Sequence, residues 1–224
     1  MNTVNNVEFK LIKAMIVERI KNGESLFGKA LQKLINSTEE ELDDFLKRRI
    51  AAKVAGEILR LISINGTLTL RALDGSRLIY NAEKTFVQCI DQDFVKWGTN
   101  NPGIPTLETL VQVHEMIKKG TALDIFSALP GNWNEKWLSQ NQVIEFCEVY
   151  PDWLRQNGNG TFFLIKKDES APVSIIKPEN DFIVAGVYVY SGGLRIGAEP
   201  LRHGNVWHGE YNYRVVSPEH ILSV

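Results

Sequence analysis

The clearest pattern in this chain lies in its last third, where short apolar runs replace the helical spacing of the earlier residues. These runs cover residues 161–165, 182–190, 194–196 and 206–216, and Gly, Pro, Asn and Ser separate them. Short runs rich in Val, Ile and aromatic residues, bounded by turn-forming residues, are typical of strands joined by tight turns. We therefore predict a C-terminal β domain over residues 157–224.

The run over residues 182–190 is apolar on both faces of the strand that it predicts. Ile183, Ala185, Val187 and Val189 alternate with Phe182, Val184, Tyr188 and Tyr190. A strand buried on both faces needs cover on both sides. We therefore expect the β domain to dock on the helices that precede it.

The earlier residues divide into three segments. Residues 1–62 follow the spacing of three amphipathic helices, of which the last, over residues 39–62, begins with a capping box and becomes apolar on most sides. Residues 63–100 predict a short three-stranded β-meander and a loop, with Asp74 and Gly75 at its first turn. Residues 101–156 return to a helical pattern.

Together these segments predict an α+β fold. A helical N-terminal half with a short β-meander is followed by a second helical segment, with helices over residues 106–120, 122–129 and 134–149. These helices pack on a C-terminal antiparallel sheet, or small open barrel, of four to five strands. The Asn-Gly run at residues 157–160 separates the last segment as a linker or a loop.

Charge disfavours a general nucleic-acid-binding surface. The net charge is −2, and 23% of the residues are charged, close to the globular average. Nucleic acid binding relies on clustered basic side chains that displace counterions. The one close match is Lys47-Arg48-Arg49, which we interpret as the exposed face of a helix because acidic residues precede it.

Cysteine usage and the N-terminus predict a cytoplasmic protein without a membrane partner. Charged residues interrupt the apolar stretch at residues 7–20, so it resembles neither a signal sequence nor a membrane span. Cys89 and Cys147 do not form a disulfide framework. Both lie in apolar segments, so we expect buried, reduced thiols.

The strand predicted over residues 206–216 carries the best candidate site. On an extended strand alternate side chains share a face. The predicted binding surface consists of one polar face and a neighbouring indole, namely His208, Glu210, Asn212, Arg214 and Trp207.

Histidine and carboxylate side chains also suit a transition metal. The cluster comprises His203, His208 and Glu210, with His220 farther along the chain. Its spacing is not an established ligand pattern. We therefore predict neither a metal nor a cofactor.

Residues 90–95, Ile-Asp-Gln-Asp-Phe-Val, form a second pattern with chemical content. The pattern resembles the first motif of the haloacid-dehalogenase-type phosphotransferases. The resemblance implies a nucleophile at Asp91 and an acid/base at Asp93, both near Mg²⁺. That family has a parallel sheet of βα units, which the predicted meander does not supply. We interpret both aspartates as polar residues at a strand end.

His114 and the tryptophans have structural interpretations. His114 lies on the apolar stripe of its predicted helix, so we expect a packed side chain with one hydrogen-bond partner. Trp133, Trp137 and Trp153 surround the helix predicted at residues 134–149. We expect them to close the core, with an aromatic binding groove as the alternative.

These observations favour a non-enzymatic protein-binding or assembly module, in which the C-terminal sheet or the Trp-rich segment contacts a protein partner. One alternative is a nucleic-acid-binding accessory protein that uses barrel aromatics and Lys47-Arg48-Arg49. A second is an enzyme or metal-binding protein with a site near His208 and Glu210, or at Asp91 and Asp93. The oligomeric state is left open.

Overall fold

The strand predicted at residues 182–190 forms with the predicted bounds and lies within a large mixed sheet. The computed structural model of the chain describes residues 58–64 and 68–219, all within the unit Ala52–Val224. The helices predicted before residue 58, the cluster Lys47-Arg48-Arg49 and His220 lie outside the described residues.

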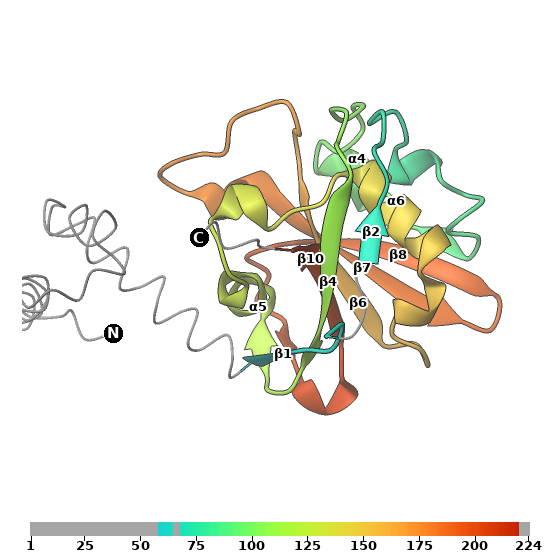
Figure 1. Cartoon of the computed structure of the whole chain (residues 1–224), viewed down its shortest axis with the longest axis vertical. Coiled ribbons are helices and arrows are strands. Elements are labelled where there is room, and N and C mark those ends of the chain that lie inside the picture. The colour runs from blue at the N-terminus through green and yellow to red at the C-terminus, as the bar shows by residue number, and fades with distance from the viewer. Residues whose placement is uncertain (1–57, 65–67, 220–224) are drawn as a thin grey trace, which may run out of the picture. The chain divides into compact units, whose positions relative to one another are not determined.

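Strands dominate the described residues. The sheet contains β1 (Leu59–Leu61), β2 (Leu68–Leu70), β3 (Cys89–Ile90), β4 (Thr109–Met116), β6 (Gly160–Lys166), β7 (Phe182–Tyr190), β8 (Gly193–Pro200) and β10 (Arg214–Pro218). Its order is β1-β4-β10-β6-β7-β8-β3, and β2 also pairs with β4 (Figure 1). The β10–β6 and β3–β8 pairs are parallel and the others antiparallel. Two short strands, β5 (Gly120–Thr121) and β9 (Val206–Trp207), pair separately.

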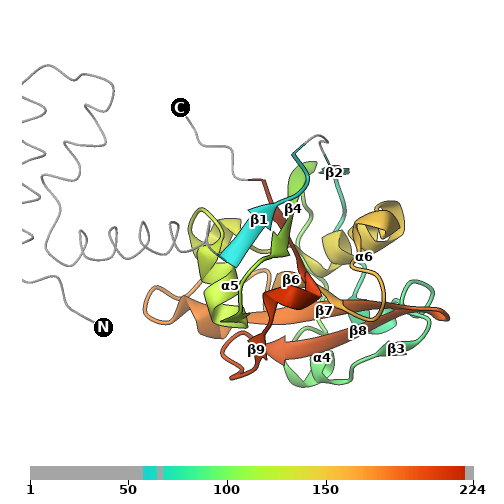
Figure 2. The same ribbon diagram turned by 90° about the horizontal axis from the view of Figure 1, so that it is seen from below.

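Helices are short and lie at different places on this sheet. Within the described residues, the α-helices are α4 (Asp93–Lys96), α5 (Ala122–Ala128) and α6 (Gln140–Val149). The 3₁₀ turns are η2 (Ile79–Asn81), η3 (Trp133–Glu135), η4 (Pro151–Trp153), η5 (Pro178–Asp181) and η6 (Gly209–Tyr211). Capping boxes at Thr121 and Ser139 begin α5 and α6. Figures 1 and 2 show α5 beside β1 and β5, and α6 beside β2.

The predicted fold class is wrong in how it divides the chain into helical and sheet parts. Residues 106–120 contain β4 instead of a helix, and β1 replaces the end of the helix predicted at residues 39–62. No meander forms over residues 63–100, because β2 pairs with β4 and β3 pairs with β8. The apolar positions of β4 fit helical and strand spacing alike, and strand partners on both sides decide the outcome.

The prediction of a C-terminal antiparallel sheet of four to five strands is also wrong, because the sheet observed in the described residues has eight strands and contains parallel pairs. The last strand, β10, lies between β4 and β6 and runs parallel to β6, so it joins early and late parts of the chain in one sheet. The strand predicted over residues 206–216 is interrupted, since η6 and the left-handed Asn212 (φ 51°) separate β9 from β10. A left-handed residue ends the alternation of side chains.

The prediction that β7 is buried on both faces is confirmed over its first six residues. On one face, Ile183, Ala185 and Val187 belong to a core shared with α6. On the other, Phe182 and Val184 belong to a second core shared with α5. The two helices therefore cover opposite faces of the strand.

The tryptophans close these cores as expected. Trp153 packs against the core that contains α6, whereas Trp133 and Trp137 pack against the other. The Trp133 ring stacks on Phe182 with its centroid 5.7 Å away. Lys136 lies 5.1 Å from the centre of the Trp133 ring and donates hydrogen bonds to Phe126 O and Ser127 O, at the end of α5.

Candidate functional site

The cover over the α5 side of β7 ends partway along the strand. Phe182 and Val184 are buried in the core, whereas Tyr188 is half-buried and Tyr190 is 45% exposed. A hollow of about 180 Å³ opens on this face at Gly186. Figure 2 shows β9 and β3 beside β8, and Trp207 of β9 and Asp91, the residue after β3, line the hollow. The hollow exists because β7 extends beyond the part of the strand that α5 covers.

The floor of the hollow is a cross-strand pair of glycines. Gly186 of β7 lies directly opposite Gly197 of β8. A Cβ built on Gly197 would meet only the Asp91 Oδ2 within 4 Å, at 3.7 Å, so this position has room. A Cβ on Gly186 would come within 3.0 Å of Tyr188 Oη and 3.1 Å of its ring. Gly186 therefore allows the Tyr188 ring to lie over the strand, as aromatic residues cover glycines in other sheets.

Aromatic rings form one wall and extend beyond the hollow. We call the connected rings of Phe162, Trp207, Tyr213, Tyr211 and His208 the aromatic series. Successive ring centroids are 4.6, 5.3, 5.8 and 6.5 Å apart, within the range of favourable ring contacts. Phe162 and Trp207 line the hollow, whereas Tyr211 and His208 are exposed. The series is thus a chain of ring contacts that runs from the hollow to the exposed side chains of Tyr211 and His208.

Three charged side chains line the hollow. Asp91 follows β3, where its N–H donates to Ile196 O at 3.0 Å and its Oδ1 accepts from Asp93 N at 3.0 Å. Its Oδ2 lies over Gly197. Among the described residues this oxygen has no hydrogen-bond partner, and Arg195 and Glu199, which flank Gly197, form no ion pair.

The pKa of Tyr188 reflects the charges on this face of the sheet. Burial, followed by the negative charge of Glu199, raises the pKa of its phenol to about 12. Arg195 acts in the opposite direction but more weakly than Glu199. The phenol is therefore a neutral hydrogen-bond donor and acceptor near pH 7.

The residues of the predicted binding surface do not share one strand face. Trp207 lies on β9 against Phe162, whereas His208 and Glu210 are exposed around η6. Asn212 follows η6 in the left-handed conformation. Of these residues, only Trp207 lines the hollow. His208 is connected to Trp207 through the ring contacts of the aromatic series. Partner binding by this surface stays a prediction.

Arg214 is bound to the protein itself. Its Nη1 donates to Asp152 O at 3.1 Å and Leu154 O at 3.2 Å. Burial lowers the pKa of the guanidinium, and Arg155 lowers it further. Arg214 therefore holds the turn after α6 against β10.

The structure separates the two aspartates of the 90–95 pattern. Asp91 lines the hollow, while Asp93 begins α4 and pairs with Lys96 at 2.5 Å. Within the described ranges, no group of three or more His, Cys, Asp or Glu side chains is placed to hold a metal ion. His203 is exposed, and its Nδ1 accepts from Asn205 N at 3.2 Å.

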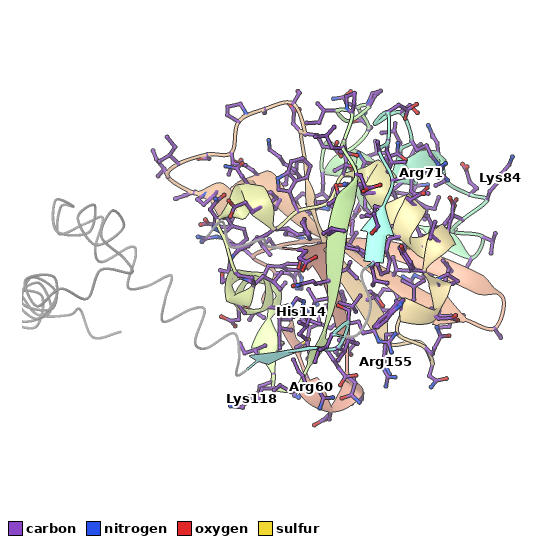
Figure 3. All side chains as sticks on the ribbon, viewed as in Figure 1. Arg60, Arg71, Lys84, His114, Lys118 and Arg155 are labelled. Carbon is purple, nitrogen blue, oxygen red and sulfur yellow. The ribbon has the colours of Figure 1, made fainter. Side chains whose placement is uncertain are left out.

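His114 is buried as predicted, but it lies on β4 between Leu61 and Val215 (Figure 3). It is 9% exposed, and burial lowers its pKa to about 4. Its Nδ1 has no hydrogen-bond partner in the described part of the chain. Cys147 is also buried, whereas Cys89 is exposed, so the prediction of two buried thiols is wrong for Cys89.

Among the described residues, Arg195 is the one basic side chain that lines the hollow. Figure 3 shows Arg71 and Lys84 in one region, and Arg60 and Lys118 in another. Arg60 pairs with Glu115 at 2.6 Å, and Arg71 pairs with Glu145 at 2.8 Å.

Sequence reasoning missed four residues of the hollow: Gly186, Gly197, Arg195 and Glu199. A signal for three of them is the alternation of β8, in which Arg195, Gly197 and Glu199 occupy every second position. This alternation identifies a polar face with a glycine at its centre. The opposing glycine becomes visible only once the register of β7 and β8 is known.

Comparisons with protein-family models, with curated proteins and with solved structures find no match to this chain. The function is therefore argued from the site itself. Among the helices in the described ranges, none has the length and apolar character that crossing a membrane requires.

Proposed function

We propose that this chain is a protein-binding module, and that the hollow over β7 and β8 receives a segment of a partner protein. The glycine floor beside aromatic rings carries this proposal, because it leaves a concave, solvent-open site on one face of the sheet. Concave sites with aromatic linings and a few polar groups are typical of binding sites. Aromatic anchors also supply much of the energy at protein interfaces.

The size of the site favours a segment of chain over a separate small molecule. The hollow measures about 180 Å³, below the roughly 300–1,000 Å³ of small-molecule pockets. The aromatic series extends the contact surface to Tyr211 and His208. A peptide that places one side chain in the hollow and continues along these rings uses both features.

The charges support a protein partner over a nucleic acid. Asp91 and Glu199 line the hollow and would repel phosphate groups. The cytoplasmic location predicted from the sequence belongs to the same proposal, and the two unbridged cysteines support it.

A plugged variant tests the proposal. In Gly197→Val the new side chain fills the hollow, and it has room, since its Cβ meets only Asp91 Oδ2 at 3.7 Å. Valine is also well suited to a strand. Gly204→Val is the matched control, because nothing lies within 4 Å of the Cβ at that exposed position.

The measurement is selection from a displayed library of random peptides with the full chain. We expect the wild type and Gly204→Val to enrich the same peptides, and Gly197→Val to lose them while keeping its circular dichroism spectrum and melting temperature. A wild type that enriches no peptide, or a folded Gly197→Val protein that binds as well as the wild type, would overturn the proposal.

A further inference from the structure

The hollow is lined by two carboxylates that form no ion pair with a described residue. Glu115, Glu145 and Glu148 each pair with an arginine of the same chain. Asp91 and Glu199 line the hollow and form no such pair, and Lys96, which acts electrostatically on Asp91, forms its ion pair with Asp93. Two carboxylates beside one concave surface attract a positive charge from outside.

Arg195 is the one cation in the lining, and it does not balance the two carboxylates. It lies on the same face of β8 as Glu199, with Gly197 between them. Its side chain is exposed, and its influence on the Tyr188 phenol is weaker than that of Glu199. The lining therefore keeps a net negative charge.

The rings of the hollow suit a cation as well. Cations bind over aromatic faces, most strongly over tryptophan. Within this chain, Lys136, Lys166 and Lys167 already lie over the rings of Trp133, Trp137 and Trp97, at 5.1, 5.5 and 5.6 Å. Trp207 has no such cation among the described residues, although it lines the hollow with Phe162 and two tyrosines.

The shape of the hollow suits a long basic side chain. Its glycine floor and aromatic wall offer apolar contact for an aliphatic stem. The Asp91 Oδ2 and the Glu199 carboxylate offer acceptors for an ammonium or guanidinium head.

We infer that the hollow takes an arginine or lysine side chain of the partner segment, held by Asp91, Glu199 and the surrounding rings. This inference rests on the proposed function and adds the chemistry of the anchoring residue.

The test uses single-residue probes and the ¹⁵N-labelled full chain. N-acetyl-arginine methylamide and N-acetyl-lysine methylamide are titrated against the protein, and N-acetyl-norleucine methylamide is the neutral control. We expect the basic probes to shift the amide signals of Gly186 and Gly197 with millimolar dissociation constants, and the neutral probe to bind at least about threefold more weakly.

Charge variants at the lining sharpen the test. Asp91→Asn and Glu199→Gln should each weaken the basic probes about three- to tenfold. Arg195→Gln should strengthen them about twofold, because it removes a like charge. Glu108→Gln is the matched control, since Glu108 is exposed and lies outside the lining, and it should change nothing.

The opposite pattern would overturn the inference. An anion site would lose its ligand in Arg195→Gln and gain affinity in the carboxylate variants, and an apolar site would bind the neutral probe equally well. Selected peptides that lack a basic residue and still lose binding in Gly197→Val would overturn the inference but leave the proposed function standing. Basic probes that bind while no peptide is enriched would instead remove the proposed function.

Discussion

At the scale of single residues, His114 links burial to stability. Burial lowers its pKa to about 4 in the folded chain, against an ordinary value of 6.5. Between these values the unfolded chain binds a proton that the folded chain does not, so stability falls as the pH drops from about 6.5 to 4. The shift corresponds to a loss of up to about 3 kcal/mol.

A variant without the imidazole should lose this contribution. We expect His114→Leu to show a shallower fall in unfolding free energy than the wild type between pH 7 and pH 4.5, measured by urea denaturation. His203→Leu, at an exposed position, is the control and should keep the wild-type dependence. Equal pH dependence in His114→Leu and the wild type would show that the loss of stability at low pH does not come from His114.

The two cysteines should differ in reactivity. Cys89 is exposed, whereas Cys147 is buried, and burial raises the pKa of its thiol. Because the thiolate is the reactive form, we expect one rapidly reacting thiol with a disulfide reagent such as DTNB under native conditions. Cys89→Ser should abolish that rapid phase, and its survival in this variant would contradict the expected burial of Cys147.

At the scale of elements, the glycine pair of β7 and β8 predicts two alanine variants of opposite sign. Gly197→Ala should stabilise the protein by about 0.4–1 kcal/mol, because its Cβ has room and the unfolded chain loses freedom. Gly186→Ala should destabilise it by about 1 kcal/mol or more, because the Cβ meets Tyr188 at 3.0 Å. Melting temperatures measure both effects. A shift of the melting temperature in the same direction in both variants would contradict the different surroundings of the two glycines.

A buried carboxylate supports the start of α6 beside the capping box at Ser139. Glu169 is buried, and its oxygens accept from Gln140 N at 2.9 Å and Ile104 N at 3.2 Å. Glu169→Gln replaces one acceptor with a donor, so we expect a loss of about 1–3 kcal/mol. Hydrogen exchange at Ile104 and Gln140 should accelerate. Asp168→Asn, at the exposed neighbouring residue, should leave both amides protected, and unchanged exchange in Glu169→Gln would exclude this role.

Single elements differ in how far their sequence predicts them. Phe182–Tyr190 forms as predicted because seven of its nine residues are Phe, Ile, Val or Tyr, which are enriched in strands. Residues 106–120 do not, because Leu110, Val111 and His114 fit a helical stripe while the same stretch also fits an alternating strand. Pairing with β1, β2 and β10 decides between the two.

At the scale of the whole molecule, the position of β10 determines what can fold alone. This strand lies between β4 and β6, so the sheet is complete only when the last residues return to its centre. We expect fragments covering residues 52–156 and 157–224 to lack dispersed NMR spectra when separate, and to gain them when mixed. A fragment 157–224 that unfolds cooperatively by itself would contradict this dependence.

The candidate site arises at the same scale. Its walls come from β6, β7, β8, β9 and the residue after β3, and no two of its charged side chains lie in one predicted motif. Sequence reasoning found Trp207 through its aromatic surroundings and Asp91 through its strand-end pattern. It placed neither residue at a hollow, because β9 pairs with β5 and β3 pairs with β8, and these partners lie far away in the sequence.

The sequence by itself determined the strands at residues 160–200 and the two buried faces of β7, because alternation and local composition indicate which side chains avoid water. Only the tertiary structure decided that β4 is a strand, that β10 enters the middle of the sheet and that Gly186 faces Gly197. These features depend on pairing between residues far apart in the chain, and a local pattern carries no record of which strand becomes the neighbour.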